Sequence, residues 1–321
     1  MSLHPAVAAV RLAVRRALVD VEPGAVVLVA CSGGADSLAL LAATIFEGRK
    51  AAWRVVGATV DHDLQGGSDG RAADLVQRMA QLGADETVSA RVSVDAGGLG
   101  PEAAAREARY AVLAQLAEHF SAATVLLGHT RDDQAETVLM GLARGSGGRS
   151  IAGMRRRFDV YRRPLLDVSR ADTEAACHAK GIAFWQDPHN HDPRFTRSRV
   201  RHQVMPMLET ELGPGVAVSL ARTADLLRRD MEYLDEVAST ALPEGDLVVE
   251  DLAALAQPIR TRVLRLAALR AGAPAADLFH AHVVGMDRLV TDWHGQTGVD
   301  LPGGHRLVRC DGVLVFTRPS R

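Results

Sequence analysis

Apolar runs alternate with amphipathic stretches through the first half of the chain. Four runs rich in β-branched residues predict buried strands, at 26–31, 53–60, 87–94 and 124–127. Apolar residues at helical spacing predict helices around them, at 5–20, 36–47, 69–82, 101–119 and 132–143. Gly48 is expected to cap the second of these helices. Such alternation predicts a doubly wound, Rossmann-like α/β fold with a mostly parallel sheet.

The regular alternation stops near Ser146, where glycines cluster. Helices are predicted again at 171–180 and 197–212, and the composition changes once more at the Gly-Pro-Gly stretch 213–215. The residues beyond it predict helices and short apolar strands of a compact α+β unit. We therefore expect two domains, residues 1–212 and a smaller α+β domain at 213–321.

A Ser-Gly-Gly turn joins the first predicted strand to its helix. Ser32, Gly33 and Gly34 form the turn, and the helix opens with Asp36 and Ser37. Glycines allow a ligand close to the backbone, and free N–H groups at a helix N-terminus attract phosphate. A carboxylate beside phosphate needs a cation between them, so Asp36 indicates Mg²⁺. The alternative is that Asp36 only complements the helix dipole and Ser32 caps the helix.

A second polar stretch, residues 128–137, follows the fourth predicted strand and opens a helix. The carboxyl ends of parallel strands share one edge of a sheet, so we expect this stretch near the Ser-Gly-Gly turn. Asp133 and Glu136 stand three apart, on one helix face, where they could hold an ammonium group or a metal, or accept a proton. The alternatives are an ordinary acidic first turn and a structural role for His129.

Charge and cysteine content narrow the function classes. The net charge is −2, but residues 144–206 hold thirteen Arg or Lys against six Asp or Glu. A basic middle on an acidic chain indicates a bound polyanion. The three widely spaced cysteines exclude a disulfide framework and a Cys-x-x-Cys site. Neither a membrane span nor a secretory signal is predicted, so we expect a cytoplasmic protein.

These motifs resemble those of a known family. Ser-Gly-Gly-Ala-Asp-Ser at 32–37 is similar to the Ser-Gly-Gly-x-Asp-Ser signature of PP-loop ATP pyrophosphatases. Gly-His-Thr-Arg-Asp-Asp-Gln-Ala-Glu-Thr at 128–137 resembles the corresponding motif of tRNA(Ile)-lysidine synthetases. Later motifs extend the resemblance to about residue 208, at 144–147, 153–154, 163–166, 187–190 and 197–201.

The resemblance implies a two-step ligation. ATP adenylates the C2 oxygen of the wobble cytidine in tRNA(Ile) with a CAU anticodon, and pyrophosphate stays in the loop. The ε-amine of free L-lysine then displaces AMP and leaves lysidine. The resemblance thus implies ATP and Mg²⁺ as cofactors and tRNA(Ile) and lysine as partners, and it is compatible with a homodimer.

It also implies roles for individual residues. Asp36 would hold Mg²⁺, Asp133 and Glu136 would anchor lysine or take its proton, and Arg109 would bind the substrate carboxylate or the α-phosphate. The residues around ATP would be Ser32, Gly33, Gly34, Asp36, Ser37, Asp61, His62, Gly128 and His129. The residues on tRNA would be Arg155, Arg156, Arg157, Arg163, Arg197 and Arg201.

One departure and two rival functions remain at this stage. The family's His-x-Leu-Arg motif here ends in Gln65, so the role of that position is open. One rival is another PP-loop adenylating enzyme, such as a tRNA 2-thiocytidine synthetase, which needs paired cysteines for an iron–sulfur cluster. The other rival is a non-catalytic nucleotide-binding module, which would need neither the Asp133/Glu136 pair nor the basic middle.

Overall fold

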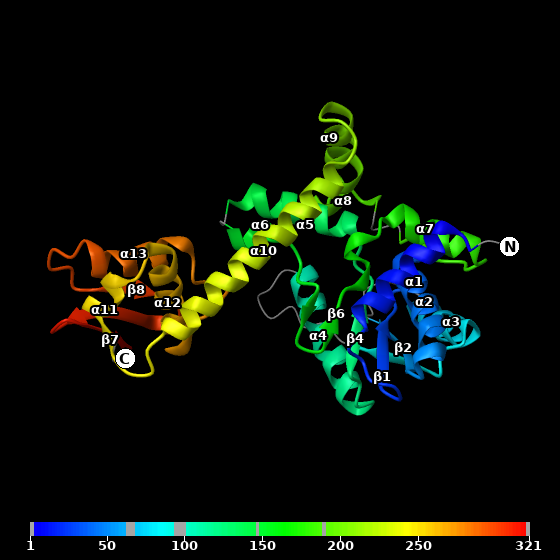
Figure 1. Cartoon of the computed structure of the whole chain (residues 1–321), viewed down its shortest axis with the longest axis horizontal. Coiled ribbons are helices and arrows are strands. Elements are labelled where there is room, and N and C mark those ends of the chain that lie inside the picture. Colours follow the sequence, from blue (N-terminus) through cyan, green and yellow to red (C-terminus); the bar gives the residue numbers. More distant parts are fainter. Residues whose placement is uncertain (1–2, 62–67, 93–100, 146–147, 188–190, 319–321) are drawn as a thin grey trace. The chain divides into compact units, whose positions relative to one another are not determined.

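The computed structural model describes residues 3–61, 68–92, 101–145, 148–187 and 191–318 (Figure 1). The chain divides into two compact units. Unit 1 comprises residues 1–145 and 153–224, and unit 2 comprises residues 146–152 and 225–321. The division falls within one long helix, α10 (Val216–Ala241), rather than at the Gly-Pro-Gly stretch before it.

Unit 1 is built on a six-stranded sheet with the order β3-β2-β1-β4-β6-β5. All neighbouring strands are parallel except β5 and β6, which form an antiparallel hairpin. The predicted doubly wound, mostly parallel sheet is thus confirmed. The strands are β1 (Val26–Ala30), β2 (Arg54–Asp61), β3 (Glu86–Arg91), β4 (Thr124–Leu127), β5 (Arg157–Phe158) and β6 (Tyr161–Arg162).

Helices cover both faces of this sheet because side chains alternate along each strand. Val27 and Val29 of β1 pack into one core cluster with α1, α2, α3 and α7, whereas Leu28 packs into another with α4. The helices of unit 1 are α1 (Pro5–Ala17), α2 (Ala35–Ala51), α3 (Ser68–Leu82), α4 (Pro101–His119), α5 (Arg131–Arg144), η1 (Pro164–Asp167), α7 (Arg170–Ala179), α8 (Thr196–Arg199), the π-helical η3 (Val200–Val204) and α9 (Met205–Glu211).

Two local expectations are wrong. Gly48 does not cap α2, which continues to Ala51 and ends at Ala52 in the left-handed conformation, with φ 57°. Glycine is needed at 48 for space instead, since an added Cβ would lie 3.0 Å from Cγ2 of Val55. The helix predicted at 197–212 is interrupted by the π-helical turn η3.

Unit 2 is the smaller α+β part, with an antiparallel sheet in the order β7-β10-β9-β8. Its core includes Leu264, Met286 and Leu307, and a buried ion pair joins Arg260 to Asp287 at 2.6 Å. Its elements besides α10 are α6 (Gly148–Ile151), β7 (Leu247–Val248), α11 (Val249–Ala254), α12 (Gln257–Arg270), α13 (His280–Thr291), β8 (Val299–Leu301), η4 (Pro302–Gly304), β9 (His305–Cys310) and β10 (Val313–Thr317).

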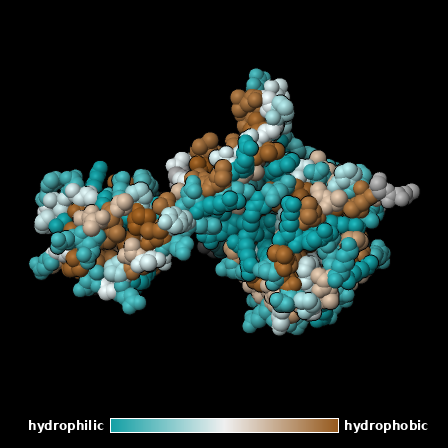
Figure 2. Space-filling view, in the orientation of Figure 1, coloured by the Kyte–Doolittle hydropathy of each residue, from teal (hydrophilic) through white to brown (hydrophobic). Residues whose placement is uncertain are grey.

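Some large hydrophobic side chains are exposed. Figure 2 shows a hydrophobic area around α9, where Met207 is 55% exposed and the following Leu212 is 73% exposed. Within the described ranges, no helix combines the length and hydropathy needed to cross a bilayer.

Candidate active site

Two loops meet at one edge of the six-stranded sheet. β1 pairs with β2 on one side and with β4 on the other, so the loops after β1 and β4 flank a topological switch point, where doubly wound folds bind ligands. A Cβ added to Gly128 would lie 3.1 Å from the backbone N of Ser37. The loop after β4 therefore touches the start of α2, and this close approach requires glycine at 128.

Internal hydrogen bonds fix the loop between β1 and α2. Gly33 has φ +86°, and its carbonyl accepts the N–H of Trp185 at 2.9 Å. The Ser37 hydroxyl donates to the Gly34 carbonyl at 3.0 Å and accepts the Ser32 N–H at 3.2 Å. Gly34 is the N-cap of α2 and has no side chain to satisfy the first helical N–H groups. This helix end is therefore suited to bind a phosphate.

Asp36 lies in the first turn of α2, partly enclosed by α7. The Thr173 hydroxyl donates a hydrogen bond to its Oδ1 atom, and Nε of Arg170 lies 3.9 Å from its Oδ2 atom. Burial raises the pKa of Asp36 to about 6, because it removes water from the charged form. A desolvated carboxylate next to a phosphate-binding helix end supplies the oxygen ligands that Mg²⁺ prefers. The residues present therefore fit a nucleotide-bound Mg²⁺.

The second predicted pair of carboxylates is buried and covered by arginines. Asp133 and Glu136 on α5 are 8% and 1% exposed. Guanidinium groups reach them from α7, α8 and η3, three elements that come later in the chain. Together with Asp36 these groups form what we call the ion-pair cluster, which consists of Asp36, Asp133, Glu136, Arg170, Arg197 and Arg201.

The three arginines are bound with different geometry. Arg201 makes two contacts with Glu136, with Nε 2.8 Å from Oε1 and Nη2 3.1 Å from Oε2. Arg197 places Nε 2.9 Å from Oε2 of Glu136. Arg170 places Nη2 2.9 Å from Oδ1 of Asp133, but its contacts with Glu136 are 3.4 Å long. Burial alone would raise the pKa of Asp133, but the charges of Arg170 and Arg197 outweigh it and hold this pKa below its usual value.

Asp133 also has a structural role. Its Oδ2 atom accepts the N–H of Thr130 at 2.8 Å, and the two residues form a capping box at the start of α5. The carboxylate of Asp132 accepts the backbone N–H of Arg170 at 2.8 Å. One oxygen of Asp133 therefore stabilises the helix start, while the other faces the ion-pair cluster.

His129 precedes this helix and lies beside Arg163, which is 5% exposed. Nε of Arg163 donates to Nδ1 of His129 at 3.3 Å, so the neutral ring carries its proton on Nε2. Desolvation lowers the pKa of His129 to about 3. Arg163 also donates to the Tyr110 hydroxyl at 3.1 Å and to the Arg155 carbonyl at 2.6 Å. Its guanidinium is therefore bound within unit 1.

The neutral state of His129 predicts a pH dependence of stability. The unfolded chain protonates this residue near pH 6.5, whereas the folded chain does so only near pH 3. Its contribution to the free energy of unfolding is thus fully present above pH 6.5 and is lost as the pH falls toward 3. His129→Gln should reduce the pH slope in this window by up to about 1.4 kcal/mol per pH unit. Urea denaturation of both proteins measures the slopes, and equal slopes would contradict a neutral His129.

Three other predicted site residues belong to β2, to the position after it and to α4. Asp61 is the last residue of β2, at the same edge of the sheet as the two loops. His62 lies outside the described residues. Arg109 occupies an exposed position on α4.

The arginines predicted to bind tRNA are divided between the surface and the interior. Arg156 pairs with Asp167 at 2.6 Å and Arg157 with Asp20 at 2.7 Å, both at exposed positions. Arg155 is exposed as well. The remaining members of the predicted set have inward-facing guanidinium groups, namely Arg163, Arg197 and Arg201.

Two residues of α7 belong to the site although sequence reasoning does not find them. Arg170 contacts all three carboxylates of the ion-pair cluster, and Thr173 holds Asp36. The sequence signal here is the capping pair Ser169 and Asp172, which predicts a helix starting at Arg170. That signal places the helix start but gives no information about which surface the helix packs on.

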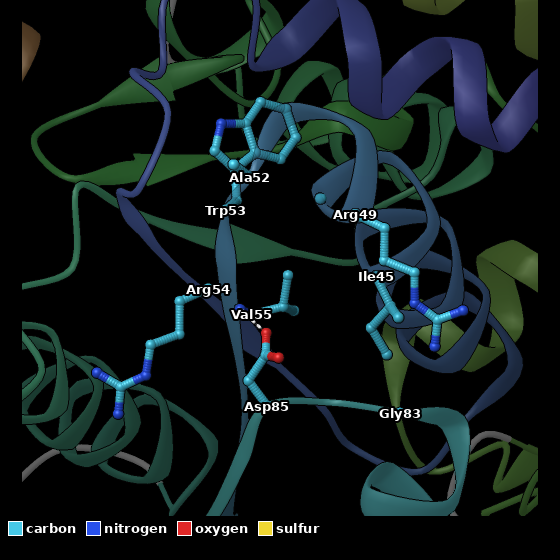
Figure 3. A pocket seen from close by; sticks show the side chains of 9 residues that line it. Ile45, Arg49, Ala52, Trp53, Arg54, Val55, Gly83 and Asp85 are labelled. Atoms are coloured by element: carbon cyan, nitrogen blue, oxygen red, sulfur yellow. Dashed lines mark hydrogen bonds between the residues drawn. The ribbon is translucent and has the colours of Figure 1, made fainter.

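A cavity of about 480 Å³ lies at the other end of the same sheet, where the parallel strands begin (Figure 3). It is formed where α2 ends and β2 begins, with Arg54 and Asp85 at its wall. The Asp85 carboxylate accepts the N–H of Val55 at 2.7 Å, and Arg54 pairs with Glu86. These polar groups are therefore used to hold neighbouring strands together, away from the two loops.

Comparisons with known proteins agree with the site. Residues 9–208 match the family model of the PP-loop domain, and residues 247–314 match that of the TilS substrate binding domain. The U34-tRNA thiolase NcsA from Methanococcus maripaludis, solved with its [4Fe-4S] cluster, has a TM-score of 0.57 at 17% identity and covers 70% of this chain and 79% of its own. That likeness concerns the fold.

Curated relatives match over nearly the whole chain. The tRNA(Ile)-lysidine synthase of Thermobifida fusca is 53% identical, with 98% of both chains covered. Those of Streptomyces coelicolor and Mycobacterium tuberculosis are 49% and 47% identical, covering 98% and 90% of this chain and 99% and 90% of their own. With a PP-loop at its switch point and relatives of this similarity, the chain belongs to the tRNA(Ile)-lysidine synthase family.

Proposed function

We propose that the chain ligates L-lysine to C2 of the wobble cytidine in tRNA(Ile) with a CAU anticodon. Family membership supports the reaction type, and one contact supports its location. Arg170 touches Asp36 of the phosphate-binding loop as well as Asp133 and Glu136 on α5. The place for the nucleotide and the buried carboxylates are therefore adjacent. We infer a cytoplasmic reaction, since ATP, free lysine and tRNA meet there.

The first step forms a bond between the C2 oxygen of the cytidine and the α-phosphorus of ATP, and pyrophosphate leaves. The N–H groups at the start of α2 and the turn at 32–34 would hold the leaving pyrophosphate. Asp36 would hold Mg²⁺, which supplies charge neutralisation for the phosphate oxygens. The neutral His129 offers its Nε2 proton as a hydrogen-bond donor at the same sheet edge.

The second step forms the bond between C2 and the ε-nitrogen of lysine, and the bond from C2 to oxygen breaks so that AMP leaves with that oxygen. The amine must lose protons, because its ordinary pKa is near 10.4. Arg170 links Asp133 and Glu136 to Asp36, and we assign proton acceptance to this pair. Both are ion-paired, so lysine has to compete for them.

The decisive experiment incubates the protein with ATP, Mg²⁺, labelled lysine and an unmodified tRNA(Ile) transcript. The expected products are labelled tRNA, AMP and pyrophosphate. Release of ADP, or tRNA without label at every salt concentration, would rule the proposal out.

Substitution of the exposed Arg156 should weaken tRNA binding and leave the stability of the fold unchanged. Arg156→Ala is expected to weaken tRNA affinity by about three- to ten-fold. The slope of log affinity against log salt concentration should become shallower by about 1. Asp167, the partner of Arg156, is 71% exposed, so the fold should keep its stability. Filter binding at several salt concentrations measures both effects. Arg54→Ala, which breaks a surface pair at the other end of the sheet, is the control, and equal behaviour of the two variants would contradict the assignment.

The principal rival, a thiolation enzyme of the same fold, finds no support in the cysteines. Cys31 and Cys177 are buried, Cys310 is exposed, and the described residues contain no cluster of three or more His, Cys, Asp or Glu side chains arranged to hold a metal ion by themselves. Burial raises the pKa of Cys31 to about 12, so this thiol stays protonated and unreactive. Ligation therefore remains the proposed function.

A further inference from the structure

The ion-pair cluster is balanced in charge. Asp36, Asp133 and Glu136 supply three carboxylates, and Arg170, Arg197 and Arg201 supply three guanidinium groups. His129 interacts electrostatically with Asp133, and its ring is neutral because its pKa is lowered to about 3. The side chains are enclosed as well, since those of the three arginines are 21%, 33% and 18% exposed.

A balanced cluster attracts an incoming ammonium group only weakly. Attraction to the carboxylates is offset by repulsion from guanidinium groups at similar distances. Burial of the added positive charge has an unfavourable desolvation energy as well. If one guanidinium group moves out of the cluster, the substrate ammonium can pair with the carboxylates that this guanidinium held, and the total charge of the cluster does not change.

The contacts indicate which guanidinium moves. Arg201 holds Glu136 with two nitrogens at 2.8 and 3.1 Å. Arg197 binds Glu136 at 2.9 Å and donates in addition to the Asp133 carbonyl at 3.2 Å, so it also fastens the helix backbone. Arg170 makes one short contact, 2.9 Å to Asp133, and lies 3.4 Å from Glu136 and 3.9 Å from Asp36. Arg197 also has one longer contact, 3.8 Å to Asp133, whereas every contact of Arg201 with these carboxylates is 3.1 Å or shorter. Arg170 thus has weaker contacts than Arg201, and it contacts all three carboxylates.

The position of Arg170 points the same way. Its guanidinium lies between Asp36, at the nucleotide loop, and the carboxylates on α5. A nucleophile that attacks an adenylated base has to approach from this region. The backbone of Arg170 stays anchored by Asp132, so its side chain can leave while α7 keeps its place.

We propose that Arg170 is a positioning residue that occupies the place of the substrate ammonium group and is displaced when lysine binds. The inference rests on the proposed function and adds that lysine and Arg170 compete for Asp133. The binding of Mg²⁺ beside Asp36 would favour the displacement, since it adds a second positive charge next to the guanidinium.

The test compares the kinetics of lysine transfer in wild type and Arg170→Met, with ATP and tRNA saturating. Removal of the competitor should lower KM for lysine about ten-fold, while KM for ATP changes little. Arg54→Met at the other end of the sheet is the matched control and should keep the wild-type KM. A KM for lysine that is unchanged or raised in Arg170→Met would overturn the proposal.

A second measurement on the wild type applies if Arg170→Met does not fold. Nε–H resonances of ¹⁵N-arginine-labelled protein are followed during a lysine titration, with Arg170 assigned through Arg170→Lys. The Arg170 resonance should move and that of Arg201 should not, and the reverse pattern or no movement would refute displacement. A wild-type enzyme that transfers no lysine at all would instead defeat the proposed function itself.

Discussion

Asp36→Asn should slow pyrophosphate release by a factor on the order of 10³, while the protein stays folded. The carboxylate lies in the first turn of α2 and is the group that we propose holds Mg²⁺, so its loss should weaken Mg²⁺ binding there. Stability should be kept because burial already disfavours the charged form and raises the pKa of Asp36 to about 6. Asparagine also retains the oxygen that accepts the Thr173 hydroxyl.

The sign of the stability effect follows from this raised pKa. The contribution of Asp36 to the free energy of unfolding is fully present below its usual pKa of 3.8 and is lost as the pH rises through about 6. Above pH 6, Asp36→Asn should therefore be as stable as the wild type or more stable. Pyrophosphate assays together with thermal unfolding measure both properties. The exposed Glu86→Gln is the control, and an active or an unfolded Asp36→Asn would contradict the assignment.

The sheet and the two loops could be predicted because their signals are local. Short apolar runs that lead into a glycine turn specify β1 and β4, and Gly33 and Gly128 mark the places where the backbone needs a positive φ or a close approach. Because β1 and β4 are parallel neighbours, the loops that follow them leave the sheet at the same edge. Sequence and topology together thus predict the sheet edge at which we propose that the nucleotide binds.

Which groups the arginines bind could not be predicted in the same way. A local excess of positive charge favours a bound polyanion, yet Arg197 and Arg201 compensate carboxylates more than sixty residues earlier in the chain. The hairpin of β5 and β6 is not predicted, because each of its strands has only two residues, one of them arginine, and so shows no alternating apolar pattern. In the folded chain, Arg162 of this hairpin is 7% exposed and pairs with Asp20. Such long-range pairing has no periodic signal.

Glu136→Gln should lose both activity and stability, in contrast to Asp36→Asn. The Glu136 side chain is 2% exposed and accepts hydrogen bonds from all three arginines of the ion-pair cluster. Its neutralisation leaves enclosed guanidinium groups without enough negative charge, which costs about 3 kcal/mol or more. For a chain of this size we expect a fall in melting temperature of about 5 °C or more. Calorimetry and the lysine-transfer assay measure the two losses.

The double variant Glu136→Gln/Arg170→Met separates charge imbalance from a general packing defect. Since it removes one charge of each sign, it should recover at least half of the lost melting temperature without recovering lysine transfer. Glu232→Gln, whose partner Arg228 lies 3.7 Å away on the surface of α10, should change the free energy of unfolding by about 0.5 kcal/mol or less. If the double variant is as unstable as the sum of its single variants, Glu136 stabilises unit 1 through packing, and the charge balance of the ion-pair cluster is not what holds α5, α7 and η3 together.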